Sequence, residues 1–117
     1  MPVTRLSAHG FAFNVNPVDR RACKSTEHHF NPTDETHGMM NDTPSHVGNL
    51  TPIYDDWNGE ATYGTEYAER PTLFWGTNSV VGRSMALYER PDDFGTKPTS
   101  ESAYNGSMGR MIACCNV

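Results

Sequence analysis

Apolar and polar residues alternate over short stretches of this chain, and no window of about 12 residues keeps the 3.6-residue apolar period of a helix. Long helices are therefore not expected, and short strands joined by polar connections are the better interpretation. From Arg83 to Glu89, for example, Met85 and Leu87 would face one side of a strand, and Ala86 and Tyr88 the other. The pattern predicts five strands, at about residues 9–15, 60–66, 72–75, 83–89 and 109–115, and a turn at 76–79.

Two long polar stretches separate these strands. Residues 16–48 hold three prolines and four of the five histidines, and residues 91–108 form the second loop. Loops of this length are uncommon in a compact domain unless a metal ion, a disulfide or another internal tie holds them. The 117 residues are about the size of one domain, so we expect residues 1–117 to belong to a single domain.

The charge of the chain excludes several kinds of partner. With 14 acidic and 9 Lys and Arg residues, its formal net charge is −5. This argues against nucleic acid, whose phosphates attract basic side chains, and against an anionic membrane surface. No apolar run reaches the roughly 18 residues that a membrane-spanning helix needs, so no membrane partner is expected.

Three cysteines, Cys23, Cys114 and Cys115, leave at least one that is unpaired within the chain or bonded to another chain. Glycosylation sequons occur at three positions, namely Asn41, Asn49 and Asn105. Together with a disulfide, they favour an extracellular, secreted protein. For Cys115, a buried free thiol and an interchain bond are both open.

His29, His37 and His46 are separated by eight and nine residues within one polar loop. Neutral imidazoles are good zinc ligands, and a structural zinc ion usually takes four nitrogen, sulfur or oxygen ligands. A metal ion would also keep so long a loop ordered. The alternative is a set of surface histidines, and the spacing alone leaves both open. His28 could replace His29, but neighbouring side chains point in different directions.

Six short motif groups stand in order along the chain. They are His9-Gly10-Phe11; Cys23 with His29-Phe30-Asn31-Pro32; His37-Gly38 with His46-Val47-Gly48-Asn49-Leu50; Ser79-Val80-Val81-Gly82-Arg83-Ser84; Asp92-Asp93-Phe94-Gly95; and Gly109-Arg110-Met111-Ile112-Ala113-Cys114. In content, order and spacing, this set resembles the copper/zinc superoxide dismutase family. Each motif alone is a weak signal, but the set extends from His9 to Cys114.

The resemblance implies an all-β fold, a Greek-key barrel or sandwich with two long loops. One loop would carry zinc and a disulfide between Cys23 and Cys114, and the other would shape the approach to copper. His29, His37 and His46 match the family's zinc-binding histidines. The fourth zinc ligand of the family is an aspartate, and the matching residue here is Asn49. A neutral amide oxygen binds zinc less strongly than a carboxylate, and a glycan at this sequon would block it.

The copper ligands of the family are largely missing. Three of its four histidines are matched by Ala12, Asn14 and Tyr88, and only His29 remains. Imidazole suits copper better than an amide does, and zinc cannot change its oxidation state. We therefore expect no bound copper and no superoxide dismutation.

Two further matched residues lose their family role when copper is absent. Arg110 matches the arginine that attracts superoxide, and Asp92 matches the carboxylate that links the two metal sites. Without copper, they are interpreted as a solvated arginine at a strand start and as a turn residue. Arg110 also stands one residue further from Cys114 than the family spacing, which indicates a β-bulge.

The family barrel has strands before the His-Gly-Phe motif, and residues 1–8 supply at most one. An open barrel exposes strand edges, so we expect a partial domain that joins other segments of a longer chain or associates with itself. The function favoured is a non-catalytic, dismutase-like domain that binds zinc or another divalent metal in an extracellular assembly, loosely similar to the copper-less dismutase-like proteins of invertebrate haemolymph. Two alternatives stay open: an active copper/zinc enzyme with altered ligands, and a metal-free structural domain.

Overall fold

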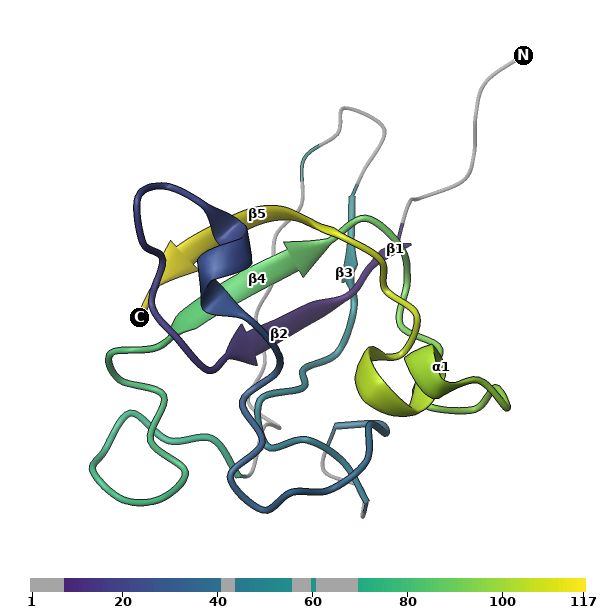
Figure 1. Ribbon diagram of the computed structural model, residues 1–117, viewed down its shortest axis with the longest axis horizontal. Helices are drawn as coiled ribbons and strands as arrows, with labels where there is room; N and C mark the ends of the chain where they lie inside the picture. The colour runs from purple at the N-terminus through teal and green to yellow at the C-terminus, as the bar shows by residue number, and fades with distance from the viewer. Residues whose placement is uncertain (1–7, 41–43, 56–59, 61–69) are drawn as a thin grey trace.

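The computed structural model describes residues 8–40, 44–55, 60 and 70–117, whose strands form two small antiparallel sheets (Figure 1). The larger sheet has the order β2-β4-β5, with β2 at Phe11–Asn14, β4 at Ser84–Tyr88 and β5 at Met111–Asn116. The smaller sheet pairs β1 (Ala8–His9) with β3 (Ile53–Tyr54). The described residues also contain a short 3-10 helix, η1 (Cys23–Thr26), and a short α-helix, α1 (Ser100–Asn105). The predicted all-β class is confirmed.

Strand β4 shows the alternation expected from its sequence. Ser84, Ala86 and Tyr88 are buried, whereas Met85 and Leu87 are half-buried on the opposite face. Because β4 lies between β2 and β5, both of its edges are paired. It therefore forms the centre of the larger sheet. Its inward face carries Tyr88 toward the loop of residues 16–48, which we call the histidine loop.

The last strand carries the irregularity that the spacing of Arg110 and Cys114 indicates. Leu87 pairs with Ala113, but the next residue of β4, Tyr88, pairs with Met111. Ile112 is therefore the extra residue of a β-bulge, and its side chain is exposed. The bulge lets the strand keep its pairing with β4 on both sides of the insertion.

The strand predicted at residues 72–75 is wrong. Thr72 makes one isolated bridge, to Ser79, and Val80 donates its backbone N–H to the Thr72 carbonyl at 2.9 Å. The segment thus folds back on itself as a closed loop. Its three large apolar side chains, Leu73, Phe74 and Trp75, are 69%, 77% and 94% exposed and do not alternate. The strand predicted at 60–66 lies outside the described residues, apart from Glu60.

The second polar loop contains a helix that the sequence pattern did not reveal. Thr99 caps α1 by accepting a hydrogen bond from the backbone N–H of Ser102 through its side chain, at 3.2 Å. Gly106 ends the helix with a φ of 72°, the left-handed conformation that glycine adopts without strain. These caps define a six-residue helix too short to show an apolar period.

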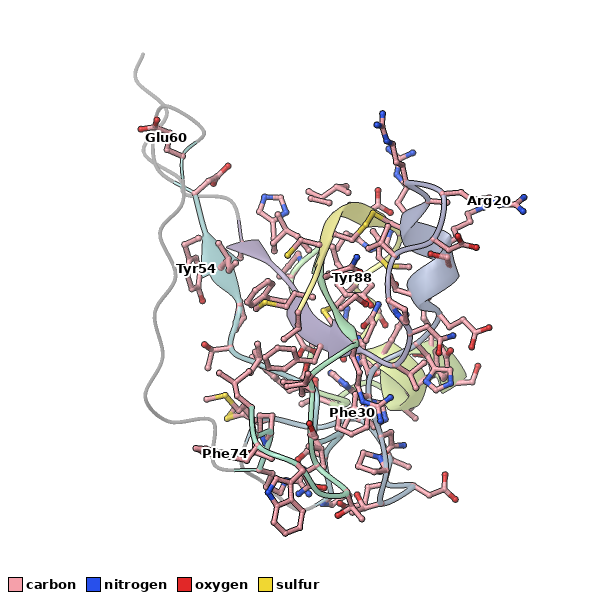
Figure 2. The ribbon with its side chains drawn as sticks, turned by 90° about the vertical axis from the view of Figure 1, so that its left-hand side faces the viewer. Arg20, Phe30, Tyr54, Glu60, Phe74 and Tyr88 are labelled. Atoms are coloured by element: carbon pink, nitrogen blue, oxygen red, sulfur yellow. A yellow bond between two sulfur atoms is a disulfide. The ribbon has the colours of Figure 1, made fainter. Side chains whose placement is uncertain are left out.

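Two small clusters of buried apolar side chains form the core. The first contains Ala12, Ala86, Tyr88 and Met108, and the second contains Phe30, Val47 and Val80. Tyr88 lies inside the molecule, whereas Arg20 and Phe74 project at its surface (Figure 2). Within the described part of the chain, no helix has the length and apolarity to cross a bilayer.

The predicted disulfide between Cys23 and Cys114 is confirmed, with an S–S distance of 2.08 Å. It joins η1, at the start of the histidine loop, to β5, and it closes a loop of 91 residues. Cross-links over long loops stabilise a fold mainly by restricting the unfolded chain.

Replacing both Cys23 and Cys114 by serine is expected to lower the free energy of unfolding by about 2–4 kcal/mol, because the unfolded chain regains this freedom. Urea unfolding of the double variant measures the loss. Cys115→Ser is the matched control, and its free energy should change by less than about 0.5 kcal/mol because Cys115 is exposed. Equal unfolding midpoints for the double variant and the unmodified chain would contradict the prediction.

Candidate metal centre

The outer edge of β2 positions two segments of the histidine loop. Phe30 donates its backbone N–H to Phe13 at 2.9 Å, and Phe13 donates to Gly48 at 2.7 Å. The backbone of Gly48 in turn donates to Phe30 at 2.8 Å. A Cβ on Gly48 would overlap the Phe13 carbonyl, so this close approach requires glycine. The neighbours of Phe30 and Gly48 are His29 and Asn49, which form isolated bridges with Asn14 and Ala12 of β2, respectively.

His37 is held in place by the second polar loop, residues 91–108. Its backbone N–H donates to the Ala103 carbonyl of α1 at 2.8 Å. Its Nε2 lies 2.6 Å from Oδ1 of Asp92, and both side chains are buried. A Cβ on Gly106 would overlap both atoms of this pair, so the glycine that ends α1 also makes room for it. The second loop therefore orients His37 through Asp92 and Gly106.

The three histidine rings meet at one point. Each pair of ring centroids among His29, His37 and His46 is 5.3 Å apart. One nitrogen from each ring lies within 4.8 Å of the others, and all three residues are buried. Nδ1 of His29 and Nδ1 of His46 are 3.1 Å apart. The structure thus brings together the three histidines that the spacing singled out, whereas His28 is exposed beside Tyr104.

The electrostatics of this cluster oppose protonation. Burial, and then the neighbouring His37 and His46, hold the pKa of His29 well below its ordinary value. Burial, and then His37, lower the pKa of His46 to about 4. Both imidazoles are therefore neutral near pH 7, which is the form that donates a lone pair to a metal ion.

Three buried polar atoms of this cluster have no hydrogen-bond partner within the described residues, namely Nδ1 of His37, Oδ1 of Asn49 and Nε2 of His29. The amide nitrogen of Asn49 donates to the Gly38 carbonyl at 2.8 Å and to Oδ2 of Asp92 at 3.1 Å. Asp92 therefore orients both His37 and Asn49 while it also begins a turn, by accepting from the backbone N–H of Phe94 at 2.7 Å. Buried polar groups are normally paired, so these atoms are available to bind a metal ion.

The donor set fits a zinc ion. Four ligands at 2.0–2.1 Å in a tetrahedron stand about 3.3 Å apart, close to the separation of the two Nδ1 atoms. His29, His37 and His46 would supply three neutral nitrogens, and Asn49 would supply its free amide oxygen. Metal-binding histidines usually also make a hydrogen bond to a carboxylate or a backbone carbonyl. His37 has such a contact with Asp92, and His46 has one with the backbone of Glu35.

A cleft of about 350 Å³ opens beside the cluster. His29 and His46 line it, together with Asp34, Glu35 and Tyr104. Of these, Asp34 brings a carboxyl group to the lining, and the carboxylate of Glu35 is paired with Arg70 at 2.9 Å.

Two of the positions that match copper ligands, Asn14 and Tyr88, belong to a buried hydrogen-bond network. The hydroxyl of Tyr88 donates to Oδ1 of Asn14 at 3.0 Å, and the amide nitrogen of Asn14 donates to Oγ1 of Thr26 at 2.9 Å. Met111 lies against the network, with its sulfur 3.3 Å from the Asn14 amide. Ala12 is fully buried and offers no donor atom. Sequence reasoning did not find this network, because Thr26 and Met111 are remote in sequence from Asn14.

Replacing Tyr88 by phenylalanine is expected to destabilise the protein by about 1–3 kcal/mol, because Oδ1 of Asn14 loses its buried donor. Chemical denaturation measures the change. Tyr54→Phe is the matched control on an exposed side chain, and its free energy of unfolding should shift by less than about 0.5 kcal/mol. Equal stabilities for the two variants would show that the network contributes nothing.

Two other residues from the sequence analysis lie away from the cluster. The side chain of Arg110 is 80% exposed and donates to Oε2 of Glu89 at 3.0 Å, as expected for a solvated arginine next to a strand. Cys115 is a free thiol that is exposed, so of the two alternatives left open for it, the buried thiol is wrong. The register of β5 places Cys115 opposite Met85, at the face of the sheet that is not packed against the histidine loop.

A mainly antiparallel fold that holds three buried, neutral histidines around one point defines a β-class protein with a candidate metal centre. The family model described as copper/zinc superoxide dismutase matches residues 3–117, and the chain belongs to this family. The chain is 31% identical over 106 residues to superoxide dismutase [Cu-Zn] A of Xenopus laevis, with 91% of this chain and 68% of the relative covered.

Two fungal dismutases and one solved structure are also similar to this chain. The dismutase of Schizosaccharomyces pombe is 32% identical over 106 residues, covering 91% of this chain and 64% of the relative. That of Cryptococcus neoformans is 30% identical over 109 residues, covering 93% and 66%. The crystal structure of the clock protein EA4 superimposes with a TM-score of 0.86 at 29% identity, covering 99% of this chain and 71% of that one. The chain spans about two thirds of the length of these curated relatives.

Proposed function

We propose that this chain is a non-catalytic member of the superoxide dismutase family that binds one divalent metal ion, zinc by preference. His29, His37 and His46 are its ligands, and Asn49 is a weak fourth. The observation that carries the proposal is that Nδ1 of His37 and Oδ1 of Asn49 are buried without a partner in the described structure, next to two neutral imidazoles. A zinc ion there would supply positive charge and a rigid tie between segments, without electron transfer.

The metal would act as a structural element of the long loop. The three histidines come from separate segments, one held by β2, one by α1 and one near Glu35. Binding by neutral imidazoles ties these segments together, so part of the binding free energy appears as folding free energy. The closed network of Tyr88 and Asn14 supports the absence of copper, since both side chains are already hydrogen-bonded to each other.

Asn49→Asp is the variant that tests this proposal. Its new carboxylate replaces a neutral ligand, so the dissociation constant for zinc is expected to fall about tenfold, equivalent to about 1.4 kcal/mol. The metal-free variant should be less stable than the unmodified protein, because the carboxylate would face Asp92 and the Gly38 carbonyl. Calorimetric titration with zinc and urea unfolding without metal measure the two effects.

Asn105→Asp is the matched control, because it adds the same charge near the end of α1, outside the histidine cluster. Its zinc affinity should equal that of the unmodified chain. If Asn49→Asp binds zinc no more tightly than Asn105→Asp, then Asn49 is not a ligand. If the unmodified chain binds no zinc at all, the proposal as a whole is wrong.

An extracellular location and self-association complete the proposal. The Cys23–Cys114 disulfide favours an oxidising compartment. An apolar groove of about 210 Å³ on the larger sheet, which contains the exposed Cys115, supports association with another copy of the chain. Sedimentation at several protein concentrations tests association, and a single monomeric species at all concentrations contradicts it.

A further inference from the structure

Arg70 connects two segments of the histidine loop that are ten residues apart. Its Nη1 donates to Oε2 of Glu35 at 2.9 Å, and its Nη2 donates to the backbone carbonyl of Ser45 at 2.7 Å and also to the Ser45 hydroxyl. The side chains of Arg70 and Glu35 are 27% and 21% exposed. The forked contact of the Arg70 guanidinium with Glu35 and Ser45 is therefore largely shielded from water. Hydrogen bonds between charged groups are strong in such surroundings.

Both partners of Arg70, Glu35 and Ser45, are next to His46, one through a hydrogen bond and the other through the chain. Ser45 precedes His46 in the chain and is fully buried. Glu35 makes a backbone hydrogen bond with the imidazole of His46. The amide of Asn31 holds the backbone of Glu35 in place, because its Nδ2 donates to the Glu35 carbonyl at 2.9 Å and its Oδ1 accepts from the Glu35 N–H at 3.0 Å. The guanidinium of Arg70 therefore holds Ser45, which precedes His46, and also Glu35, whose backbone makes a hydrogen bond with the His46 ring.

We propose that Arg70 is a positioning residue for His46 at the metal centre, which it reaches through Glu35 and Ser45 without touching the metal. This inference rests on the proposed function, since it assigns His46 a metal to bind. His29 and His37 are positioned by other means, the edge of β2 and the Asp92 carboxylate. Arg70 therefore controls one ligand of the three. Outer contacts that fix a ligand ring change metal affinity by 10–100-fold when they are lost.

The test compares Arg70→Gln with the unmodified chain. Arg70→Gln removes the charge and the fork, and zinc affinity measured against a competing chelator is expected to fall about tenfold. Arg70→Lys keeps a charge but not the planar fork, so a smaller loss is expected. Arg90→Gln is the matched control, because Arg90 pairs with Glu89 and Glu101 at the surface, and its affinity should change by less than about twofold.

A spectroscopic readout separates positioning from a general effect on folding. Long-range ¹H–¹⁵N spectra of the zinc-saturated protein report the ring nitrogens of each histidine. Arg70→Gln should shift or broaden the signals of His46 and leave those of His37 unchanged. Equal changes at both histidines, or unchanged zinc affinity in Arg70→Gln, overturn the assignment of Arg70 and leave the metal centre standing. Absence of zinc binding by the unmodified chain overturns the proposed function, and this inference with it. If Arg70→Gln does not fold, Arg70→Lys is judged by the same two readouts.

Discussion

Zinc affinity is expected to fall about 100-fold or more when His37 is replaced by alanine, because the site loses one of three strong ligands. The remaining donors would be two imidazoles and one neutral amide, and Asp92 would lose the imidazole that it meets at 2.6 Å. Isothermal titration with zinc, or competition against a chelator, measures the change. Circular dichroism must show that the variant keeps its fold.

His28→Ala is the matched control for this loss. His28 is adjacent to His29 in the chain, but its side chain is exposed and lies outside the cluster of three. Its replacement should change zinc affinity by less than about twofold. If His37→Ala binds zinc as tightly as His28→Ala, the three histidines do not form a metal centre.

Superoxide turnover should be absent even when the protein is incubated with both copper and zinc. Dismutation needs a metal ion that alternates between two oxidation states, and zinc does not. Of the four positions that match copper ligands, only His29 has an imidazole, and Asn14 and Tyr88 are bonded to each other in the interior.

Turnover is measured after unbound copper has been removed with a chelator, since free copper itself consumes superoxide. The relative from Schizosaccharomyces pombe that is named superoxide dismutase [Cu-Zn] serves as the positive control. The treated chain should not exceed the buffer blank. Turnover that rises in proportion to protein-bound copper would contradict the prediction and would favour an enzyme with altered ligands.

Much of the fold and of the cluster could be predicted because the signals are local or rest on motif spacing. The alternation in β4 depends on neighbouring residues, and the spacing of the three histidines is a property of one loop. The apolar residues of segment 72–75 favour a strand in the sequence pattern, but the folded segment is not one. A strand also needs a partner edge, and a sequence pattern does not reveal whether one is present.

The contacts that sequence reasoning missed are all long-range. Asp92 meets His37 across 55 residues, and Tyr88 meets Asn14 across 74. Arg70 has no motif around it, and only the folded chain places its guanidinium between Glu35 and Ser45. Single polar side chains carry no periodic pattern, so their partners become visible only when the backbone is placed.

Metal content measures directly whether the chain keeps one metal centre of the family and lacks the other. The full chain is incubated with excess zinc and copper and dialysed, and its metals are quantified by mass spectrometry together with the electron paramagnetic resonance spectrum. We predict one metal ion per chain, which is lost in His37→Ala, and no second, copper-specific site. Two metal ions per chain with the signal of an imidazole-bound Cu(II) in addition to zinc, or no retained metal at all, would contradict it.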